Sequence, residues 1–152
     1  MENEFIFRDA TALKDDEIYL EIERVAPADD EKGFVPSYIF GIHEVKSGAR
    51  LGGLSLRVGD TEHTYFRGNM GYDIDLQYRG YHYAAKACRL ALILAEEHGM
   101  KRVIIACHPD NVASQKTCEY LGARLLEIAT VPKGSYMYER GERQEFIYLL
   151  EL

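Results

Sequence analysis

The sequence predicts one domain of mixed α/β class, in which helices pack on a mostly antiparallel sheet that contains one parallel pair of strands. A length of 152 residues and a hydrophobic share of 47% suit a single domain with its own core, covering residues 1–152. The first third of the chain alternates apolar and polar residues with the period of strands. The segment 69–107 has the pattern strand–helix–strand, which predicts a right-handed crossover between two parallel strands.

The first strand is expected to begin near Ile18. Ile18, Leu20 and Ile22 alternate with polar residues, as they do along a strand with one buried face. A helix is the alternative interpretation, because Ile18, Ile22 and Val25 also suit a helix face. Isoleucine and tyrosine favour strands, and Pro27 ends the segment, so we predict a strand.

Three more strands are expected before the first helix. They cover residues 38–45, 50–58 and 69–76, and the turn 46–48 (KSG) joins the first two of them as a hairpin. The stretch 26–36 (APADDEKGFVP) resembles a linker in composition. It is too short to separate two domains, so we expect a long loop there.

A helix is expected where the hydrophobic period changes. From Tyr83 to His98 the apolar residues form a wide helical stripe, and Gly99 stands where a C-terminal helix glycine belongs. Residues 102–107 (RVIIAC) then form a short, continuously apolar run. Such a run is typical of a strand that is buried on both faces.

A second helix and two strands complete the order of elements. The helix covers residues 112–121, with Asn111 as its N-cap and Gly122 as its stop signal. Strands are expected at about 124–131 and 144–151, joined by the polar stretch KGSYMYERGER. The predicted order is therefore β-β-β-β-α-β-α-β-β.

The charge of the chain argues against nucleic acid and membrane surfaces as partners. The sequence has 25 acidic and 18 basic residues, a net charge of −7, whereas a protein that neutralises phosphate backbones would have a basic excess. The most apolar stretch, residues 88–95, contains Arg89 and is far too short to span a bilayer.

Three cysteines, Cys88, Cys107 and Cys118, are odd in number and follow no metal-binding spacing. We interpret them as reduced thiols of a cytoplasmic protein, not as a disulfide framework or a zinc site. The N-terminal segment 1–9 (MENEFIFRD) is acidic and lacks the basic-then-apolar order of a signal peptide.

The stretch QYRGYHYAAKA, residues 77–87, places Arg79 and Gly80 between an expected strand and an expected helix. The first turn of a helix has free N–H groups and the positive end of the helix dipole, and amides of a preceding turn can join them. Such a site binds phosphate or pyrophosphate, with Gly80 allowing a positive φ and Arg79 adding a positive charge. On this turn alone, a connector with a surface arginine is an equally good interpretation.

The same turn resembles motif A of the GNAT superfamily of N-acetyltransferases, which has the pattern Arg/Gln-x-x-Gly-x-Gly/Ala. Arg79 fills the first position and Ala84 the last, whereas His82 stands where a glycine is usual. The stretch HPDNVASQKTCEYLGA, residues 108–123, resembles motif B of that family, in which an asparagine after a strand precedes a helix ending in Leu-Gly. Within this superfamily the chain is similar to a bacterial subgroup of predicted acetyltransferases.

This resemblance implies an acyltransferase that moves an acetyl group from acetyl-CoA, its co-substrate, to the amine of a small molecule by direct transfer, without a metal. It implies that Ile74 and Leu76 offer backbone groups to the pantetheine arm, and that Asn111 and Ser114 contact the same arm. Core packing, a helix N-cap and an exposed helix serine are the structural alternatives. The pyrophosphate would be bound by Arg79, Gly80, Tyr81, His82, Tyr83 and Ala84.

The sequence departs from the family pattern at three places. His82 adds a side chain to the pyrophosphate loop, which a helical backbone at this residue would tolerate. Cys118 stands where many members have a tyrosine that protonates the departing CoA thiolate, and the loop 26–36 replaces two helices that usually follow the first strand. These departures leave a non-catalytic CoA-binding sensor or interaction module as the alternative function, and a binder of another phosphorylated ligand as a third.

Transfer to an amine needs a base that takes a proton from the ammonium group and an acid that protonates the thiolate. Asp73 is the candidate base, because it shares a strand face with Asp75, and Cys118 is the candidate acid. His43 and His108 are further base candidates, since imidazole titrates near neutral pH. Each has a structural alternative: a solvated carboxylate, a structural histidine or a small buried thiol.

The acceptor and the assembly are only loosely constrained by the sequence. The tyrosines of segment 136–148 and the acidic composition suggest a pocket for a cationic or polar acceptor. The exposed C-terminal strands of the fold can pair between subunits, so the resemblance is compatible with a homodimer.

Overall fold

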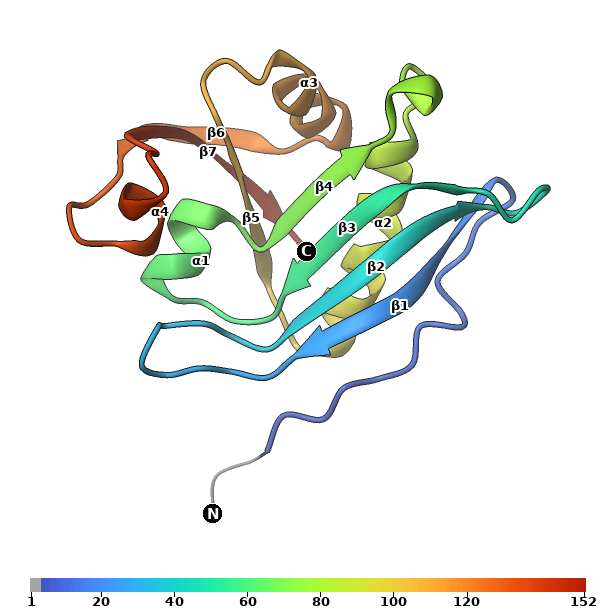
Figure 1. Cartoon of the computed structure of the whole chain (residues 1–152), viewed down its shortest axis with the longest axis horizontal. Coiled ribbons are helices and arrows are strands. Elements are labelled where there is room, and N and C mark those ends of the chain that lie inside the picture. Colours follow the sequence, from blue (N-terminus) through green and yellow to red (C-terminus); the bar gives the residue numbers. More distant parts are fainter. Residues whose placement is uncertain (1–3) are drawn as a thin grey trace.

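The computed structural model describes residues 4–152 and confirms a mixed α/β fold, built from two sheets with helices packed on them (Figure 1). One sheet has the strand order β1-β2-β3-β4 and the other β5-β7-β6. The strands are β1 (Ile18–Ala26), β2 (Ser37–Glu44), β3 (Arg50–Arg57), β4 (Met70–Ile74), β5 (Arg102–Cys107), β6 (Arg124–Thr130) and β7 (Gln144–Glu151). The helices are α1 (Glu62–Arg67), α2 (Tyr83–Glu97), α3 (Val112–Leu121) and α4 (Tyr136–Glu139), and a 3₁₀ turn covers Leu76–Tyr78.

Two kinds of local signal put these elements where the sequence predicts them. β1 is a strand and not a helix, because its alternating apolar residues face the core. α3 begins after Asn111, whose side chain accepts a hydrogen bond from the amide of Ser114 (3.1 Å). It ends at Gly122, which has a φ of 83° and is left-handed, as the stop signal predicts.

The fourth strand is shorter than the sequence predicts. β4 ends at Ile74, so Asp75 and Leu76 lie outside it. The chain turns at Asp75, whose amide donates to Leu51 and whose carbonyl accepts from Tyr78. Leu76 therefore lies in the 3₁₀ turn with its side chain 77% exposed. The predictions that Leu76 is a strand residue and that Asp75 shares a strand face with Asp73 are both wrong.

Two short helices, α1 and α4, were not predicted from the sequence. α1 starts with a capping box, in which Thr61 accepts from the amide of Thr64 (3.2 Å) and Thr64 accepts from the amide of Thr61 (2.8 Å). α4 starts at Ser135, whose hydroxyl accepts from the amide of Tyr138. Helices this short have too few turns to produce a hydrophobic period. α1 packs against β5 and β7, and α4 packs against α1.

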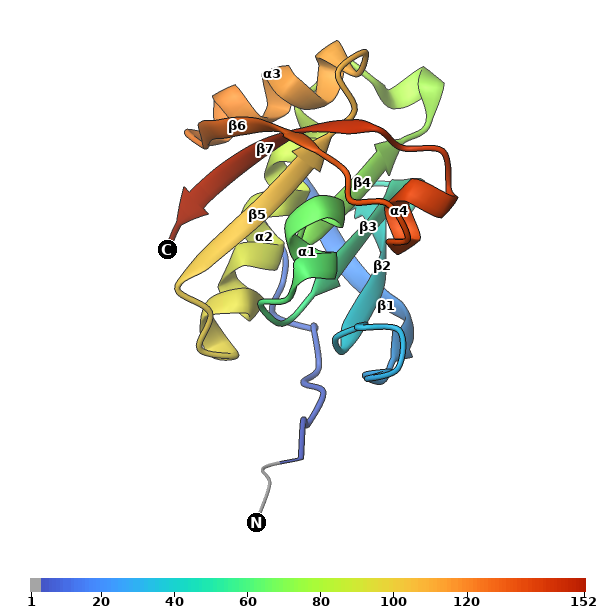
Figure 2. The ribbon, with the colours of Figure 1, turned by 90° about the vertical axis from the view of Figure 1, so that its left-hand side faces the viewer.

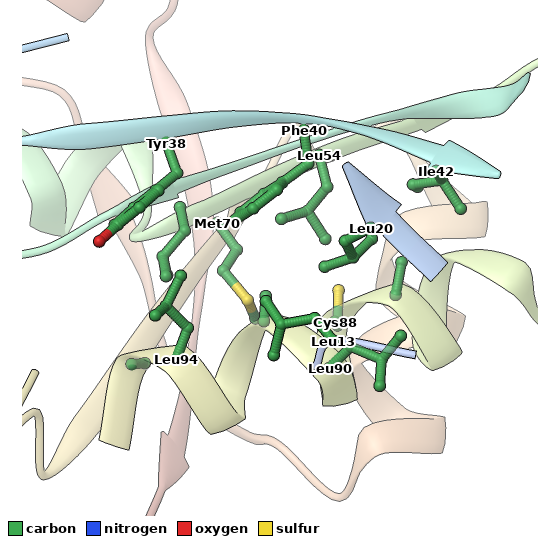
Figure 3. Packing of buried hydrophobic residues seen from close by; sticks show 14 of the residues in the cluster. Leu13, Leu20, Tyr38, Phe40, Ile42, Leu54, Met70, Cys88, Leu90 and Leu94 are labelled. Carbon is green, nitrogen blue, oxygen red and sulfur yellow. The ribbon is translucent and has the colours of Figure 1, made fainter. Parts of the chain in front are cut away.

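The main core lies between α2 and the four-stranded sheet (Figure 3). Cys88 and Leu94 of α2 pack in the same cluster as Phe40 and Met70 of the sheet, and each of these side chains is at most 1% exposed. Truncating a buried leucine such as Leu94 to alanine typically costs about 2–5 kcal/mol. This packing fixes the position of α2 and, with it, the loop that precedes the helix.

A single polar residue joins the two sheets where β4 and β5 begin. Asn69 is only 3% exposed. Its backbone amide donates to the carbonyl of Ile104 (2.6 Å), and its side-chain Oδ1 accepts from the backbone amide of Ile104 (2.8 Å). Beyond this point, no ladder joins β4 to β5 within residues 4–152. The two strands run in the same direction and belong to different sheets (Figure 2). Facing edges of both strands thus keep free backbone groups.

Among residues 4–152, no helix is long and apolar enough to cross a membrane. The first three residues of the acidic N-terminal segment lie outside the described part of the chain.

Candidate functional site

The Arg79 loop, residues 79–82, connects the 3₁₀ turn to α2, which begins at Tyr83. Gly80 has a φ of 96°, with open space around the position that a Cβ would take, so a glycine is needed there for its conformation. Within residues 4–152, none of the amides of residues 80–85 donates to a protein acceptor. These amides, which include those of the first turn of α2, form a cluster of free donors that favours an anion.

His82 has a left-handed backbone, with φ 61° and ψ 23°. It is the one non-glycine residue with positive φ in the part of the chain that the structure describes. The helical backbone that would make a side chain tolerable here is therefore absent, and the conformation costs energy. Its ring stacks on Tyr120 of α3, with centroids 4.3 Å apart and planes 13° apart. This contact ties the loop to α3.

Arg79 links the loop to the end of β4. Its Nε donates to the carbonyl of Ile74 (2.7 Å), and its Nη2 lies 3.5 Å from Oδ1 of Asp73. The side chain remains 57% exposed, so a phosphate can still reach its free donors. The structure thus brings together three predicted site residues, while Leu76 is turned outward from this group.

The remaining predicted loop residues lie along the start of α2. Tyr81 is 61% exposed and packs on Tyr83, with ring centroids 5.6 Å apart. Ala84 is half-buried in the first helical turn. Asn111 is exposed and caps α3, which is its structural alternative.

A hydroxyl and thiol cluster fills the space where β4, β5 and α3 meet. The hydroxyl of Tyr72 lies 2.9 Å from that of Ser114 and 3.9 Å from Sγ of Cys118. Sγ of Cys107 lies 3.1 Å from Oγ of Ser114 and 3.7 Å from Sγ of Cys118. Ser114 therefore stands at the centre of the cluster, in contact with both diverging strands.

The groups of this cluster have shifted pKa values, in opposite directions for its two thiols. A hydrogen bond to Cys107 and burial raise the pKa of Cys118, and burial raises the pKa of Tyr72. The hydrogen bond from Cys118 lowers the pKa of Cys107. Cys118 is fully buried, whereas Ser114 is half-buried. Of the two α3 side chains, Ser114 is the one that a ligand can reach.

The predicted bases occupy separate places. Asp73 is exposed at the end of β4, beside Arg79. His43 lies near Glu21 (3.4 Å) and stacks on Tyr19, with centroids 5.1 Å apart. His108 follows β5, exposed and far along the sequence from both.

A comparison with protein families decides the assignment. The sequence matches the family model of the acetyltransferase (GNAT) domain over residues 4–124. The chain belongs to the GNAT family. The matched region includes the Arg79 loop and α3, the two segments that resemble motifs A and B.

Solved structures of similar proteins share the GNAT fold. A candidate ribosomal-protein-serine acetyltransferase from Vibrio cholerae matches with a TM-score of 0.58 and 22% identity, over 76% of this chain and 64% of that one. A GNAT-family acetyltransferase from Bacillus anthracis gives 0.57 and 19%, over 74% and 65%. The microcin C7 self-immunity acetyltransferase MccE, in complex with acetyl-CoA and AMP, gives 0.57 and 21%, over 81% and 63%. The chain thus spans just under two thirds of each of these three structures.

A comparison of the sequence with curated proteins gives no match.

Two residues of this GNAT chain were missed from the sequence. Tyr72 is a candidate because the fold brings its hydroxyl to Ser114 of α3, and nothing in its local sequence pattern signals this contact. Glu145 of β7 is 3% exposed, and burial together with the neighbouring Glu142 raises its pKa to about 8. Glu142 also lies 3.9 Å from Nε2 of His108. A carboxyl that titrates near neutral pH is a candidate for proton transfer.

Proposed function

We propose that this chain is an acetyl-CoA-dependent N-acetyltransferase whose acceptor is the amine of a small molecule. One observation carries the proposal: the free amides of residues 80–85 lie at the end of the diverging strands β4 and β5, whose facing edges lack a ladder. The amides suit a pyrophosphate, and the strand edges suit the amides of a pantetheine arm. Acetyl-CoA carries both groups in one molecule.

In this proposal, Arg79, Gly80, Tyr81, His82, Tyr83 and Ala84 bind the pyrophosphate. Backbone groups of β4 up to the amide of Ile74 pair with the pantetheine arm, because the carbonyl of Ile74 already accepts from Arg79. Asn111 and Ser114 border the arm from α3. The thioester then lies near the junction of β4, β5 and α3.

The transfer proceeds directly in a complex of enzyme, acetyl-CoA and amine. The amine nitrogen attacks the thioester carbonyl, a C–N bond forms, the C–S bond breaks, and the electron pair leaves on sulfur. The amine loses one proton and the CoA thiolate takes one. Ser114, hydrogen-bonded to Tyr72, is better placed than the buried Cys118 to supply that proton. Asp73 is the candidate base on β4, and the group of Glu145, Glu142 and His108 is its alternative.

We also infer a single domain in a reducing compartment such as the cytoplasm. The main cluster of buried residues includes side chains of both sheets, and the three cysteines are buried and free. A homodimer is a further proposal, supported by the edge strand β6 with its exposed Leu125, Leu126 and Ile128. Light scattering coupled to gel filtration measures that state.

A thermal-shift titration tests whether the chain binds acetyl-CoA. At about 100 times Kd, a ligand adds about 2.7 kcal/mol, which raises the Tm of a domain of this size by about 5–10 °C. We expect this shift with acetyl-CoA and not with ATP. Arg79→Glu should abolish it, whereas Arg124→Glu, an exposed arginine of β6, should retain it.

Each other outcome favours a named alternative. A shift without thiol release, whatever the amine, favours the non-catalytic CoA-binding module. An equal shift with ATP favours a binder of another phosphorylated ligand. No shift with acetyl-CoA contradicts the proposal.

A further inference from the structure

A pocket of about 290 Å³ lies on the face of the four-stranded sheet opposite α2. Its floor comes from β1, β2 and β3, and its walls come from the loop between β1 and β2 and from α1. From the resemblance to the GNAT family, this loop is expected to replace two helices that usually follow the first strand. The volume suits part of a small ligand.

The lining of this pocket is strongly basic. Arg24, Arg57, Arg67 and His63 line it, and none of its lining residues is an aspartate or a glutamate. Within residues 4–152, none of the three arginines has a carboxylate partner within 4 Å. In a chain with a net charge of −7, three unpaired arginines in one pocket are unexpected for a surface without a function.

Arg57 is the most unusual of these residues, because its side chain is 8% exposed without an acidic partner. Its Nη1 donates to the carbonyl of Gly68 (3.0 Å), and a guanidinium group has four further N–H donors. Burial and the nearby Arg67 lower the pKa of Arg57 to about 9, so it stays charged at neutral pH. Burying an uncompensated charge destabilises a fold unless something else pairs with it.

The other half of the pocket is apolar. Phe34, Val35 and Ile39 line it, and His63 packs on Phe34 with ring centroids 4.6 Å apart. Burial and the neighbouring Arg67 lower the pKa of His63 to about 4, so this ring is neutral at pH 7. Tyr136, which does not line the pocket, packs on both rings from outside, with centroids 5.3 Å from those of Phe34 and His63. The pocket therefore suits a short apolar body with a negative end.

Arg57 lies beside β4, the strand that is proposed to hold the pantetheine arm. A Cβ at Gly71 would lie only 3.4 Å from Nη2 of Arg57, so the guanidinium group covers β4 at this residue. Gly71 pairs with Ser55, which lines the pocket. Asp73 lies on the same face of β4, two residues beyond Gly71, which is about 7 Å along the strand. A ligand of a few bonds can thus reach from Arg57 toward the proposed reaction centre.

We propose that this pocket binds a negatively charged group, a carboxylate or a phosphate, of the small-molecule acceptor whose amine is acetylated. This inference rests on the proposed function, and it narrows the acceptor to amines that carry an acid group. Arg57 and Arg67 bind the oxyanion, and Phe34 and Ile39 pack on the linking carbons. The expectation of a cationic acceptor does not fit these residues, because a second positive charge would meet three arginines.

Matched acceptors test the inference. The pairs are β-alanine with 3-aminopropanamide, and 2-aminoethyl phosphate with ethanolamine, so the two pairs also separate a carboxylate from a phosphate. We expect kcat/KM to be about 30-fold higher or more for the charged member of at least one pair, as a charge-assisted contact to arginine predicts. Equal kcat/KM values within each pair would overturn the inference.

Substitutions of the pocket arginines test whether these residues cause the preference for the charged acceptor. Arg67→Gln should remove most of the preference by raising KM for the charged amine, with little change for the neutral one. Arg57→Lys should weaken it while keeping the buried charge. Arg124→Gln on β6 is the matched control and should keep the preference.

A binding readout keeps the inference separate from catalysis. Inorganic phosphate or propanoate should raise the Tm of the wild-type chain and of Arg124→Gln above that in sodium chloride of equal ionic strength, and Arg67→Gln should lose this rise. Arg67→Gln should still bind acetyl-CoA. Acetyl-CoA binding without anion binding or charge preference would leave the proposed function intact and overturn the inference. Anion binding without acetyl-CoA binding would overturn the proposed function and the acceptor role.

Discussion

Asn69 and Ile104 hold the two sheets together at the point where β4 and β5 diverge. The amide of Asn69 donates to the carbonyl of Ile104 (2.6 Å), and Oδ1 of Asn69 accepts from the amide of Ile104 (2.8 Å). Nδ2 of Asn69 also donates to the carbonyls of Arg57 and Gly59, both at 2.9 Å. One buried residue, through its backbone and its side chain, thus joins the two strands where no ladder connects them.

Asn69→Ala should destabilise the chain strongly. The change leaves one buried amide and two carbonyls without their partner, each of which costs about 1–3 kcal/mol when buried. We expect a loss of about 3 kcal/mol in the free energy of unfolding, measured by urea denaturation. Asn111→Ala is the control, since losing an exposed helix cap costs about 1 kcal/mol. Equal losses in the two variants would show that Asn69 is not the junction.

His82 should respond differently to glycine and to alanine. Both changes remove the stack on Tyr120, but only glycine relieves the left-handed backbone at φ 61°. His82→Gly should be close to the wild type in stability, and His82→Ala about 1 kcal/mol less stable than His82→Gly. Urea unfolding of the three chains checks the order. An alanine variant as stable as the glycine variant would refute the left-handed conformation.

Cys118 and Ser114, one helical turn apart on α3, are the two candidate proton donors, and substitutions at each distinguish between them. Cys118→Ala should keep kcat within about threefold, because the thiol is fully buried and holds its proton. Ser114→Ala should lower kcat by about 100-fold, the usual scale of general acid catalysis. Steady-state thiol release measures both. The reverse order would restore Cys118 as the acid.

Glu145 should make stability fall as pH rises. Its pKa is raised from 4.5 to about 8, so between these values the folded chain keeps a proton that the unfolded chain has lost. The contribution of protonated Glu145 to the free energy of unfolding is therefore fully present below about pH 4.5 and is lost as pH rises toward 8. Glu145→Gln keeps a neutral side chain, so its Tm should exceed that of the wild type by more at pH 8 than at pH 5. A difference that stays constant over this range would contradict the raised pKa.

Segments with strong local signals were predicted well. α3 lies between Asn111 and Gly122 because a cap and a left-handed glycine fix its two ends. α2 begins at Tyr83, as the change in hydrophobic period indicates, and the free amides before it follow from that start. The end of β4 was missed because the turn at Asp75 depends on a hydrogen bond to Leu51, a contact distant in sequence.

The basic pocket has no comparable local signal. Arg57, His63 and Arg67 belong to β3 and α1, and Arg24 belongs to β1, so the fold alone brings them together. Each arginine in isolation is an ordinary charged residue in a chain with an acidic excess. Burial without an acidic partner is what distinguishes Arg57, and burial is a property of the packed structure. The acidic composition of the sequence suggested a cationic or polar acceptor, whereas the pocket is the basis for proposing an acceptor that carries an acid group.

Release of CoA together with formation of an N-acetylated amine would demonstrate the proposed acetyl transfer itself. The full chain is incubated with acetyl-CoA and β-alanine, and free thiol and product mass are followed together. We expect equimolar thiol and acetyl-β-alanine, with both lost in Arg79→Glu and the product strongly reduced in Arg67→Gln. Tight binding of acetyl-CoA without thiol release for β-alanine, 2-aminoethyl phosphate or their neutral partners would contradict this expectation.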